Sequence, residues 1–418
     1  MTHCRFCKSP LAHQYIDLGD APPSNSYLKK DQLDNKEAIY PLKLFVCGKC
    51  FLVQLDEFKA AKEIFDSEYA YFSSYSKSWL DHCKRYVEKV STEFHLSTKS
   101  KVVEIASNDG YLLQYFQEKK IPCLGVEPTQ STADVAIKKG IRTVVRFFGE
   151  QCANDLVSSE GKATLIAAKN VLAHVPDIND LIKGIKILLA YDGVFTAEFP
   201  HLLQLAKFHQ FDTIYHEHFS YFSLMTMTQI LKKHGLRIFD VEELPTHGGS
   251  LRVYADHGAD LGTDLGTDHP IRLVTGRVGR LLQTELGAGM GELKFYSGLQ
   301  EAADNIKLKF NGFLLDAKKS KKKVAAFGAA AKGNTLLNYC GVKSDEISFV
   351  AESSPYKQGK FLPGSHIPIV AEDVIRREKP DYVIILPWNL KNEISEKLSY
   401  IRAWDGKFVL AIPDLTVY

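Results

Sequence analysis

The chain has 418 residues, which at about 150 residues per domain predicts two or three domains. Hydrophobic residues make up 45% and charged residues 24% of it, a globular composition that excludes a largely disordered or collagen-like chain. The 52 basic and 50 acidic residues leave a formal net charge of +2, too balanced for a protein that binds nucleic acid mainly through phosphate contacts.

The chain contains no apolar run near the roughly 20 residues that a membrane helix needs. Its polar start, MTHCRFCKSP, is not a secretory signal. We therefore expect a soluble cytoplasmic protein with reduced thiols, with neither a membrane nor a nucleic acid as partner.

Residues 1–65 contain two CxxC pairs, Cys4 with Cys7 and Cys47 with Cys50. This segment has few apolar anchors and would form a poor core alone, whereas four thiolates suit one tetrahedral Zn²⁺ ion. We predict a small zinc-binding module in which the metal is structural, because four sulfur ligands leave no open position for catalysis. The alternative is four unconnected buried cysteines.

Residues 66–257 begin with a helical lead-in that carries aromatic residues, for which we expect packing between domains. The strands VVEIAS, IPCLGVEP, IRTVV, ATLIAA and GVFTAEFP then alternate with amphipathic helices, which predicts a doubly wound α/β sheet. The strands RIFDVEEL and GGSLRVYADH follow as a closing hairpin. This hairpin resembles the last two strands of class I methyltransferases.

Residues 258–322 start with a Gly/Asp/Thr-rich linker, and a long helix is predicted from about 296 to 322. Apolar residues at a spacing of three and four should share its buried face: Leu299, Ala303, Ile306, Phe310 and Phe313. Residues 323–418 contain the strands VAAFGAA, EISFVAE, DYVIILPW and KFVLAIP and predict a second, Rossmann-like α/β domain.

The middle domain has a candidate nucleoside site where its strands end. The first strand contains Glu104 and runs into the polar turn Ser107-Asn108-Asp109-Gly110, without the glycines of a dinucleotide site. The second strand ends at Glu127-Pro128, where a carboxylate can accept hydrogen bonds from both ribose hydroxyls. This spacing occurs in both NAD and S-adenosylmethionine sites, and a solvated Glu127 is the alternative.

Later strand ends face the same predicted cleft. Phe147 and Phe148 follow the third strand and can flank an adenine ring, and Asn170 and His174 follow the fourth. A functional role for His174 is favoured, with a structural histidine as the alternative.

The densest group of chemical side chains is Tyr215-His216-Glu217-His218, which follows Glu198 in the chain. An HxH pattern suggests a metal, but without a further carboxylate at ligand spacing it is weak. Acid–base chemistry fits better, because histidine exchanges protons near neutrality and a tyrosine can donate to a developing oxyanion. A polar structural loop is the alternative.

Long ordered segments of the chain resemble the sugar C-methyltransferases that act on nucleotide-linked 4-ketohexoses in deoxysugar biosynthesis. They include EYAYFSSYS, VVEIASNDGYLL, NVLAHVPD, FDTIYHEHFSYFS, THGGSLRVYA, FGAAAKGNTLLNY and SSPYKQGKFLPGSHIPI. The resemblance covers nearly the whole chain. It implies that the middle domain binds S-adenosylmethionine and that the C-terminal domain helps to hold the nucleotide sugar.

The resemblance also assigns roles to residues. It implies that His218 is the catalytic base and that Tyr215, Glu217 and His174 orient it, stabilise an enolate or contact the sugar. Tyr69, His216 and Glu198 are the further expected sugar contacts. Lys332 and Asn334 near a helix start, with Lys357 and Gln358, suit a diphosphate, although each could be an ordinary surface residue.

Two positions depart from the family pattern. The fourth-strand segment reads AAKN, with Lys169 where a neutral residue is expected, and the C-terminal turn reads AESS, where an acidic residue directly before a polar one is more usual. The first departure puts the local cofactor contacts in question, and the second weakens inference about the ligand of that turn.

The predicted function is methyl transfer from S-adenosylmethionine to C3 of a nucleoside-diphosphate 4-keto-6-deoxyhexose through a base-generated enolate. The alternatives are methylation of another sugar carbon such as C5, methylation of RNA by a zinc-containing enzyme, and a non-catalytic scaffold that binds a nucleotide sugar. The sequence leaves the oligomeric state open.

Overall fold

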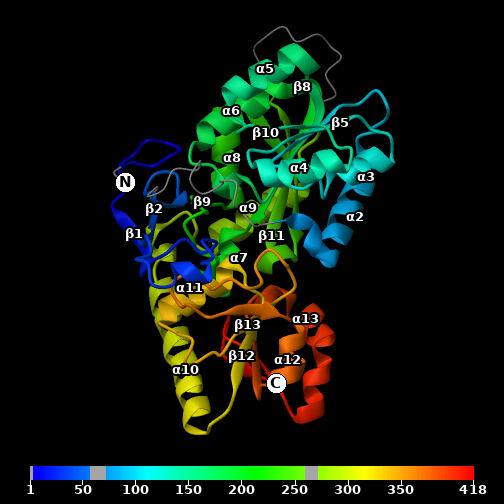
Figure 1. The fold of residues 1–418 in the computed structure, drawn as a ribbon. Helices are drawn as coiled ribbons and strands as arrows, with labels where there is room; N and C mark the ends of the chain where they lie inside the picture. The colour runs from blue at the N-terminus through cyan, green and yellow to red at the C-terminus, as the bar shows by residue number, and fades with distance from the viewer. Residues whose placement is uncertain (1–2, 57–71, 259–271) are drawn as a thin grey trace.

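The computed structural model describes residues 3–56, 72–258 and 272–418, which form three β-sheets with helices around them (Figure 1). The sheets follow the order of the chain, from a small N-terminal sheet through a seven-stranded middle sheet to a six-stranded C-terminal sheet. In Figure 1 the middle domain lies above the C-terminal domain, and the N-terminal strands lie at one side of the molecule.

The N-terminal sheet is completed by a strand from the middle domain. Its own strands are antiparallel: β1 (His13–Ala21), β2 (Tyr40–Val46) and β3 (Val53–Leu55). The fourth strand is β9 (Ser220–Tyr221), in which Tyr221 pairs with Val53 of β3. The segment that follows Tyr215–His218 therefore belongs to the sheet of the N-terminal module, a connection that the sequence did not predict.

The middle sheet has the predicted doubly wound topology, in the order β10-β11-β8-β7-β4-β5-β6. β11 lies between β8 and β10 and is antiparallel to both, as expected for the closing hairpin, whereas the other strands are parallel. The strands are β4 (Val102–Ile105), β5 (Cys123–Val126), β6 (Thr143–Val144), β7 (Ala163–Lys169), β8 (Leu189–Pro200), β10 (Leu236–Leu244) and β11 (Ser250–His257).

Amphipathic helices cover this sheet because its central strands are apolar and buried along their length. Several helices start at side-chain caps: Ser76 accepts a hydrogen bond from the Trp79 N–H, and Asp177 accepts from two N–H groups of the next helix. The covering helices are α2 (Lys77–Glu93), α3 (Leu113–Glu118), α4 (Gln130–Lys138), α5 (Glu150–Glu160), α6 (Ile178–Leu188) and α8 (Leu224–Lys233). The helix α7 (Leu202–Lys207) follows β8 and packs instead in the core shared with the N-terminal and C-terminal sheets.

The C-terminal sheet has the order β14-β13-β12-β15-β16-β17 and is parallel except for β17. Its strands are β12 (Val324–Phe327), β13 (Val350–Glu352), β14 (Ile369–Ala371), β15 (Tyr382–Ile385), β16 (Lys407–Leu410) and β17 (Thr416–Val417). Its helices are α11 (Ala331–Cys340), α12 (Asp373–Glu378) and α13 (Lys391–Lys397). This confirms the predicted second α/β domain, with β14 and β17 in addition to the predicted strands.

Two helices, α9 (Gly276–Gly287) and α10 (Leu299–Lys319), connect the middle and C-terminal domains. The predicted long helix is confirmed as α10, which extends down one side of the molecule in Figure 1. Phe313 is wrong as a member of its buried face: it is only half-buried, and Leu314 takes that place. The apolar stripe drifts by one residue because a helix turns every 3.6 residues.

Short 3₁₀ helices mark several turns between these elements. They are η1 (Lys30–Gln32), η2 (Ser73–Tyr75), η3 (Leu172–His174), η4 (Phe211–Thr213), η5 (Thr246–Gly248), η6 (Leu293–Tyr296), η7 (Trp388–Leu390) and η8 (Ser399–Trp404). The domain boundaries predicted after residues 65, 257 and 322 stay predictions, and the first lies outside the described residues.

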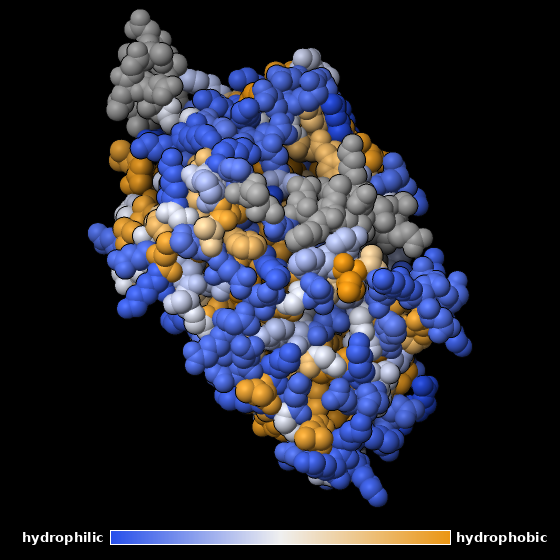
Figure 2. Space-filling model, turned by 90° about the vertical axis from the view of Figure 1, so that its left-hand side faces the viewer, coloured by the Kyte–Doolittle hydropathy of each residue, from blue (hydrophilic) through white to orange (hydrophobic). Residues whose placement is uncertain are grey.

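The face of the molecule shown in Figure 2 is mostly hydrophilic, with apolar residues in small separate groups. Within the described parts of the chain, every helix is too short or too polar to cross a lipid bilayer.

Candidate active site

The two CxxC pairs come together at one point. The Sγ atoms of Cys4 and Cys50 are 3.7 Å apart, those of Cys7 and Cys47 are 3.5 Å apart, and all four lie within 4.8 Å of one another. Four Zn–S bonds of about 2.3 Å in a tetrahedron require sulfur–sulfur distances of this size. The cluster therefore fits Zn²⁺ with four thiolate ligands, and such a closed set makes the metal structural.

The polar turn after β4 has a backbone that few residues can adopt. Ala106 and Asn108 have φ angles of 55° and 49°, and Gly110 has a φ of 77°. A Cβ atom on Gly110 would lie 2.3 Å from the Cδ1 of Ile141, so only glycine fits there. The turn presents Ser107, Asn108 and Asp109 at the carboxyl edge of the sheet, where ligands of such sheets bind.

The residues before α2 cover this turn. The Ser73 N–H donates to Oδ1 of Asn108 at 3.0 Å, and the Ser74 N–H donates to Oδ2 of Asp109 at 3.2 Å. Phe72 stacks on Tyr356 of the C-terminal domain at 4.6 Å between ring centroids. The expected packing of this aromatic segment between domains is confirmed for Phe72. The predicted sugar contact Tyr69 lies outside the described residues.

The two carboxylates of the candidate cofactor site are buried. Glu127 accepts backbone hydrogen bonds from Asn108 at 2.9 Å and Thr129 at 2.8 Å. Burial raises the pKa of Glu127, and these N–H groups partly offset that effect. Burial also raises the pKa of Glu104 well above its ordinary value. Both acceptors are thus held at the end of adjacent strands, as a ribose-binding site requires.

Some buried polar atoms at this edge lack a hydrogen-bond partner among the described residues: Oγ of Ser107, Oδ1 of Asp109 and Oδ1 of Asn170. Buried polar atoms normally have a partner, so these fit a bound polar molecule. The residues present therefore fit a nucleoside-bearing cofactor. Phe148 packs against the main core whereas Phe147 is 39% exposed, so Phe147 is the more accessible of the predicted adenine neighbours.

Glu198 forms the centre of a buried charge cluster. Lys169 Nζ donates to its Oε2 at 2.8 Å, and Nη2 of Arg252 donates to the same oxygen at 3.0 Å. His82 of α2 approaches Oε1 at 2.9 Å. The cations and His82 hold the pKa of Glu198 well below its ordinary value even though burial acts in the opposite direction.

This cluster explains the unexpected lysine in the AAKN segment. The Lys169 side chain is 2% exposed and points at Glu198, while the next residue, Asn170, faces η5 through a 3.0 Å contact between its Nδ2 and Nε2 of His247. Lys169 thus neutralises a buried carboxylate. The role of Glu198 as a sugar contact stays a prediction.

The loop 215–218 holds His218 in a defined tautomer. Nδ1 of His218 lies 3.0 Å from the Thr213 carbonyl oxygen, which can only accept, so Nδ1 carries the hydrogen. Nε2 therefore has a free lone pair, and the Tyr215 hydroxyl donates to it at 2.7 Å. Burial, reinforced by His174, holds the pKa of His218 well below its ordinary value. The ring is consequently neutral at pH 7 and able to accept a proton.

The predicted catalytic residues lie together. The rings of His174 and His218 are 4.7 Å apart in an edge-to-face arrangement, and burial lowers the pKa of His174 to about 4. Glu217 and His216 point instead at the N-terminal module: Asn25 Nδ2 donates to Oε1 of Glu217 at 2.7 Å, and His216 Nε2 donates to the Tyr40 carbonyl oxygen at 3.1 Å.

The predicted residues of the C-terminal domain are two lysines, whose ammonium groups contact an aromatic ring or a carbonyl oxygen, and two amides, which bond to the backbone. Lys332 is half-buried near the loop 215–218, with its Nζ 4.7 Å from the centroid of the Trp388 ring, and burial lowers its pKa to about 8. Lys357 donates to the Ala329 carbonyl oxygen at 2.8 Å. Asn334 and Gln358 donate to backbone carbonyl oxygens and so fasten the chain.

The sequence missed several residues that the fold brings to this site. Asp212 of η4 is fully buried, accepts a 2.7 Å hydrogen bond from Trp388 Nε1, and has its pKa raised to about 6 by burial. Asn25 and His247 were also missed. Asp212 is the second residue of the FDTIYHEH segment and could have been noticed there, but Asn25 lies in an unremarkable APPSNSYL stretch.

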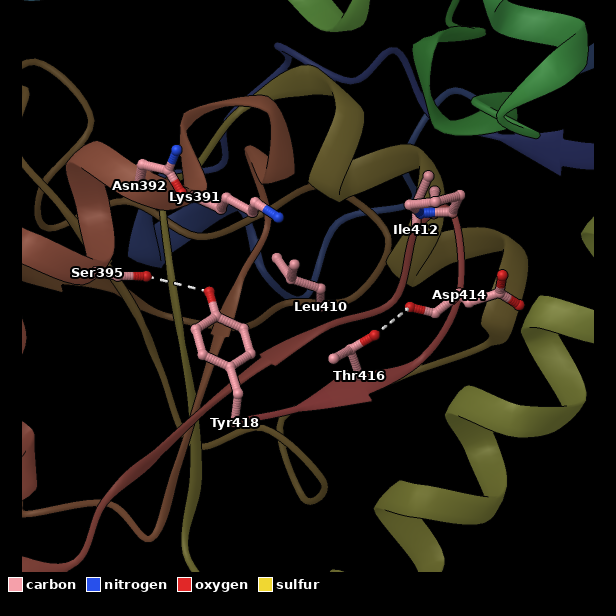
Figure 3. Close-up of a pocket in the computed structure, with 9 residues that line it drawn as sticks. Lys391, Asn392, Ser395, Leu410, Ile412, Asp414, Thr416 and Tyr418 are labelled. Atoms are coloured by element: carbon pink, nitrogen blue, oxygen red, sulfur yellow. Dashed lines mark hydrogen bonds between the residues drawn. The ribbon is translucent and has the colours of Figure 1, made fainter.

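A pocket of about 720 Å³ lies in the C-terminal domain between α13 and the end of β16 (Figure 3). On one side of it, the hydroxyls of Ser395 and Tyr418 are 3.0 Å apart. None of the predicted site residues is among its lining residues, so it is separate from the candidate active site.

Three family models match consecutive parts of the chain. A "Putative zinc binding domain" matches residues 4–65, a "Methyltransferase domain" matches residues 76–241, and a "C-methyltransferase C-terminal domain" matches residues 245–413. Together with the strand order and the four-cysteine cluster, these matches define an S-adenosylmethionine-dependent methyltransferase of class I fold with a zinc-binding module.

A curated relative extends over the whole chain. The C-methyltransferase NovU of Streptomyces niveus is 32% identical over 411 residues, which cover 98% of this chain and 95% of that protein. The chain therefore belongs to the S-adenosylmethionine-dependent C-methyltransferase family.

Solved methyltransferase structures match less than half of the chain. An S-adenosylmethionine-dependent methyltransferase from Clostridium acetobutylicum is 13% identical, covering 43% of this chain and 92% of its own, with a TM-score of 0.35. The CcbJ methyltransferase from Streptomyces caelestis is 12% identical, covering 42% and 90%, with a TM-score of 0.35.

We expect the double variant Cys7→Ser/Cys47→Ser to lose its zinc and to unfold at a lower temperature, because the free energy of metal binding contributes to the folding free energy of the module. Metal content by mass spectrometry and thermal unfolding test this. The control is Cys123→Ser, which changes a half-buried cysteine outside the cluster. A double variant with the zinc content of the unmodified protein would contradict the assignment.

We expect Lys169→Met to destabilise the middle domain by about 3–5 kcal/mol, because it leaves the buried Glu198 carboxylate short of a cation. Thermal unfolding measures the effect. Arg146→Met removes a cation from the exposed pair with Asp155 and should change the unfolding temperature little. Equal unfolding temperatures for the two variants would show that Glu198 does not depend on Lys169.

Proposed function

We propose that the protein transfers the methyl group of S-adenosylmethionine to C3 of a nucleoside-diphosphate 4-keto-6-deoxyhexose. Family membership gives the C-methyltransferase activity, and the resemblance to sugar C-methyltransferases supports this substrate. The observation that carries the proposal is the neutral, oriented His218 imidazole, because forming a carbon–carbon bond at a saturated sugar carbon requires a base.

The chemistry of the substrate defines what the base must do. A ketone at C4 acidifies the hydrogen on C3, and removing it gives an enolate whose charge rests largely on the C4 oxygen. In this proposal Nε2 of His218 accepts the C3 proton, while Nδ1–H keeps its hydrogen bond to Thr213. The Tyr215 hydroxyl, released from Nε2, donates to the C4 oxygen.

The neighbouring residues set up this proton transfer. His174 lies against the His218 ring and, with burial, disfavours its protonated form. Glu217 orients the loop and contacts the sugar, with His216, Glu198 and Tyr69 as the further proposed sugar contacts. The site keeps water away from the base because His218 is 9% exposed.

The cofactor supplies an electrophilic methyl group when it is bound, so the reaction needs no catalytic metal. We assign its binding to the edge formed by the ends of β4, β5 and β7. Glu127 and Glu104 would accept from ribose and amine groups. The remaining proposed contacts are Ser107, Asn108, Asp109, Gly110, Pro128, Phe147, Phe148 and Asn170.

The C-terminal domain offers cations for the diphosphate. Lys332 and Lys357 both lie on the side of that domain that faces the catalytic loop or the N-terminal module. Asn334 and Gln358 are the other proposed contacts. A nucleotide-sugar substrate and eight cysteines without a disulfide fit a cytoplasmic enzyme.

The decisive experiment incubates the purified protein with S-adenosylmethionine and a panel of nucleoside-diphosphate 4-keto-6-deoxyhexoses in deuterated buffer. Mass spectrometry detects an added methyl group and ring deuterium, and NMR locates both. We expect methylation at C3 of one panel member. Methylation at C5 would correct the position, and the absence of both signals from a zinc-loaded, cofactor-binding protein would contradict the proposal.

We expect His218→Asn to lower the methylation rate at least about 100-fold, the usual contribution of a general base. Binding of the cofactor, measured by calorimetry, should be unchanged because His218 is not among its proposed contacts. His95→Asn is the control for the same substitution, since His95 is exposed and lies just after the end of α2, outside the candidate site. Near-normal turnover by the His218 variant would remove it as the base.

The rate should stay constant as the pH falls to 6.5 and decline only at lower pH, because the reactive form of His218 is neutral and its pKa is depressed. Stability should fall over the same acid range. His174 and His247 have pKa values of about 4 in the folded protein, so below about pH 6.5 the unfolded chain binds protons first. Initial rates and unfolding temperatures against pH test both. A half-maximal rate near pH 7 would contradict the first expectation.

A further inference from the structure

We propose that the zinc-binding module forms part of the active site, with Asn25 as a positioning residue that holds the Glu217 carboxylate and, through it, the loop that carries the proposed base His218. The inference rests on the proposed function of the loop 215–218. It gives the module a role in the reaction itself, in addition to its structural metal.

The first observation is the contact between the two side chains. Asn25 Nδ2 donates to Oε1 of Glu217 at 2.7 Å, across 192 residues of sequence. Glu217 is 3% exposed, so its carboxylate depends on donors from the protein. A hydrogen bond to a charged, buried acceptor is among the stronger kinds, and it sets the direction in which the carboxylate points.

The second observation is that Asn25 is itself held in one orientation. The Tyr27 hydroxyl lies 3.1 Å from Oδ1 of Asn25 and shares its single hydrogen between that oxygen and a nearer carbonyl oxygen, which favours the amide orientation that points the nitrogen at Glu217. The same hydroxyl is 2.7 Å from the Ala329 carbonyl oxygen, to which Lys357 Nζ also donates. Burial raises the pKa of Tyr27, so the hydroxyl keeps its proton. A continuous set of contacts thus joins the C-terminal domain to Glu217 through the module.

The third observation is that the backbone around Asn25 is fixed on both sides. Before it, the Ser24 carbonyl oxygen accepts from Asn334 Nδ2 at 3.3 Å. After it, Leu28 and Phe361 exchange backbone hydrogen bonds of 3.0 and 2.8 Å. Because the loop is anchored to the C-terminal domain at both ends, Asn25 reaches Glu217 from a rigid support.

The position of Glu217 explains why this support matters. Glu217 precedes His218 directly, and its other neighbour, His216, is bound to the Tyr40 carbonyl oxygen of the same module. A displacement of about 1 Å in a group that orients a substrate can lower a rate about 100-fold. The module therefore sets the geometry of the catalytic loop at two adjacent residues.

The test uses the full-length, zinc-loaded enzyme and the acceptor that the panel experiment identifies. We expect Asn25→Ala to lower kcat about 10-fold or more, with unchanged zinc content and unchanged KM for the cofactor. Asn25→Asp should lower kcat further, since it places a second carboxylate against Glu217. Asn35→Ala, an exposed asparagine of the same module, should have the kcat of the unmodified enzyme.

A double-mutant cycle separates positioning from a general structural effect. If Asn25 acts through Glu217, Asn25→Ala/Glu217→Ala should be no more than about twofold slower than Glu217→Ala alone. Losses that multiply, a normal kcat for Asn25→Ala, or loss of zinc from that variant would each overturn the proposal.

The cycle is also measured by thermal unfolding, which requires no substrate. An enzyme with no turnover on any 4-keto sugar nucleotide would contradict the proposed function, whereas the unfolding cycle still tests the pairing. Coupled unfolding temperatures support the contact between Asn25 and Glu217. Additive unfolding temperatures overturn it.

Discussion

The pairing of β3 with β9 is the constraint on which the candidate active site depends. It involves only Val53 and Gln54 on one side and Tyr221 and Ser220 on the other, yet it begins two residues after His218. Arg5 reinforces it by donating to the Leu55 and Pro176 carbonyl oxygens at 2.5 and 2.8 Å. The loop 215–218 is thereby fixed close to its C-terminal end by the sheet of the zinc-binding module, which limits the movement of His218.

The buried charge cluster around Glu198 is a second constraint on the fold. The carboxylate of Glu198 at the end of β8 is contacted by Lys169 of β7, Arg252 of β11 and His82 of α2. A buried carboxylate held by two cations and a histidine is costly to rearrange, since the loss of one cation weakens the compensation of a buried charge. The ends of three strands and one helix are consequently held together around Glu198.

Much of this arrangement was predictable from local sequence. Apolar runs separated by amphipathic helices predicted both α/β domains, and paired cysteines predicted the zinc cluster. The strands β1–β3, β9, β14 and β17 were not predicted: β3, β9, β14 and β17 have only two or three residues each, and β1 and β2 carry no strong alternation of apolar residues, so their pairing depends on partners elsewhere in the chain. For the same reason the sequence indicated that Lys169 was unusual but not that it neutralises Glu198, and it gave no sign that Asn25 would contact Glu217. These features arise from packing between domains.

The shared sheet also has a consequence for biosynthesis. The ribosome completes β3 long before it reaches Ser220, so the outer edge of the small sheet stays without its partner for roughly 10–30 seconds at typical elongation rates. An open strand edge is a template for pairing with another chain. The nascent module is thus exposed to misassembly until the methyltransferase domain emerges and β9 pairs with β3.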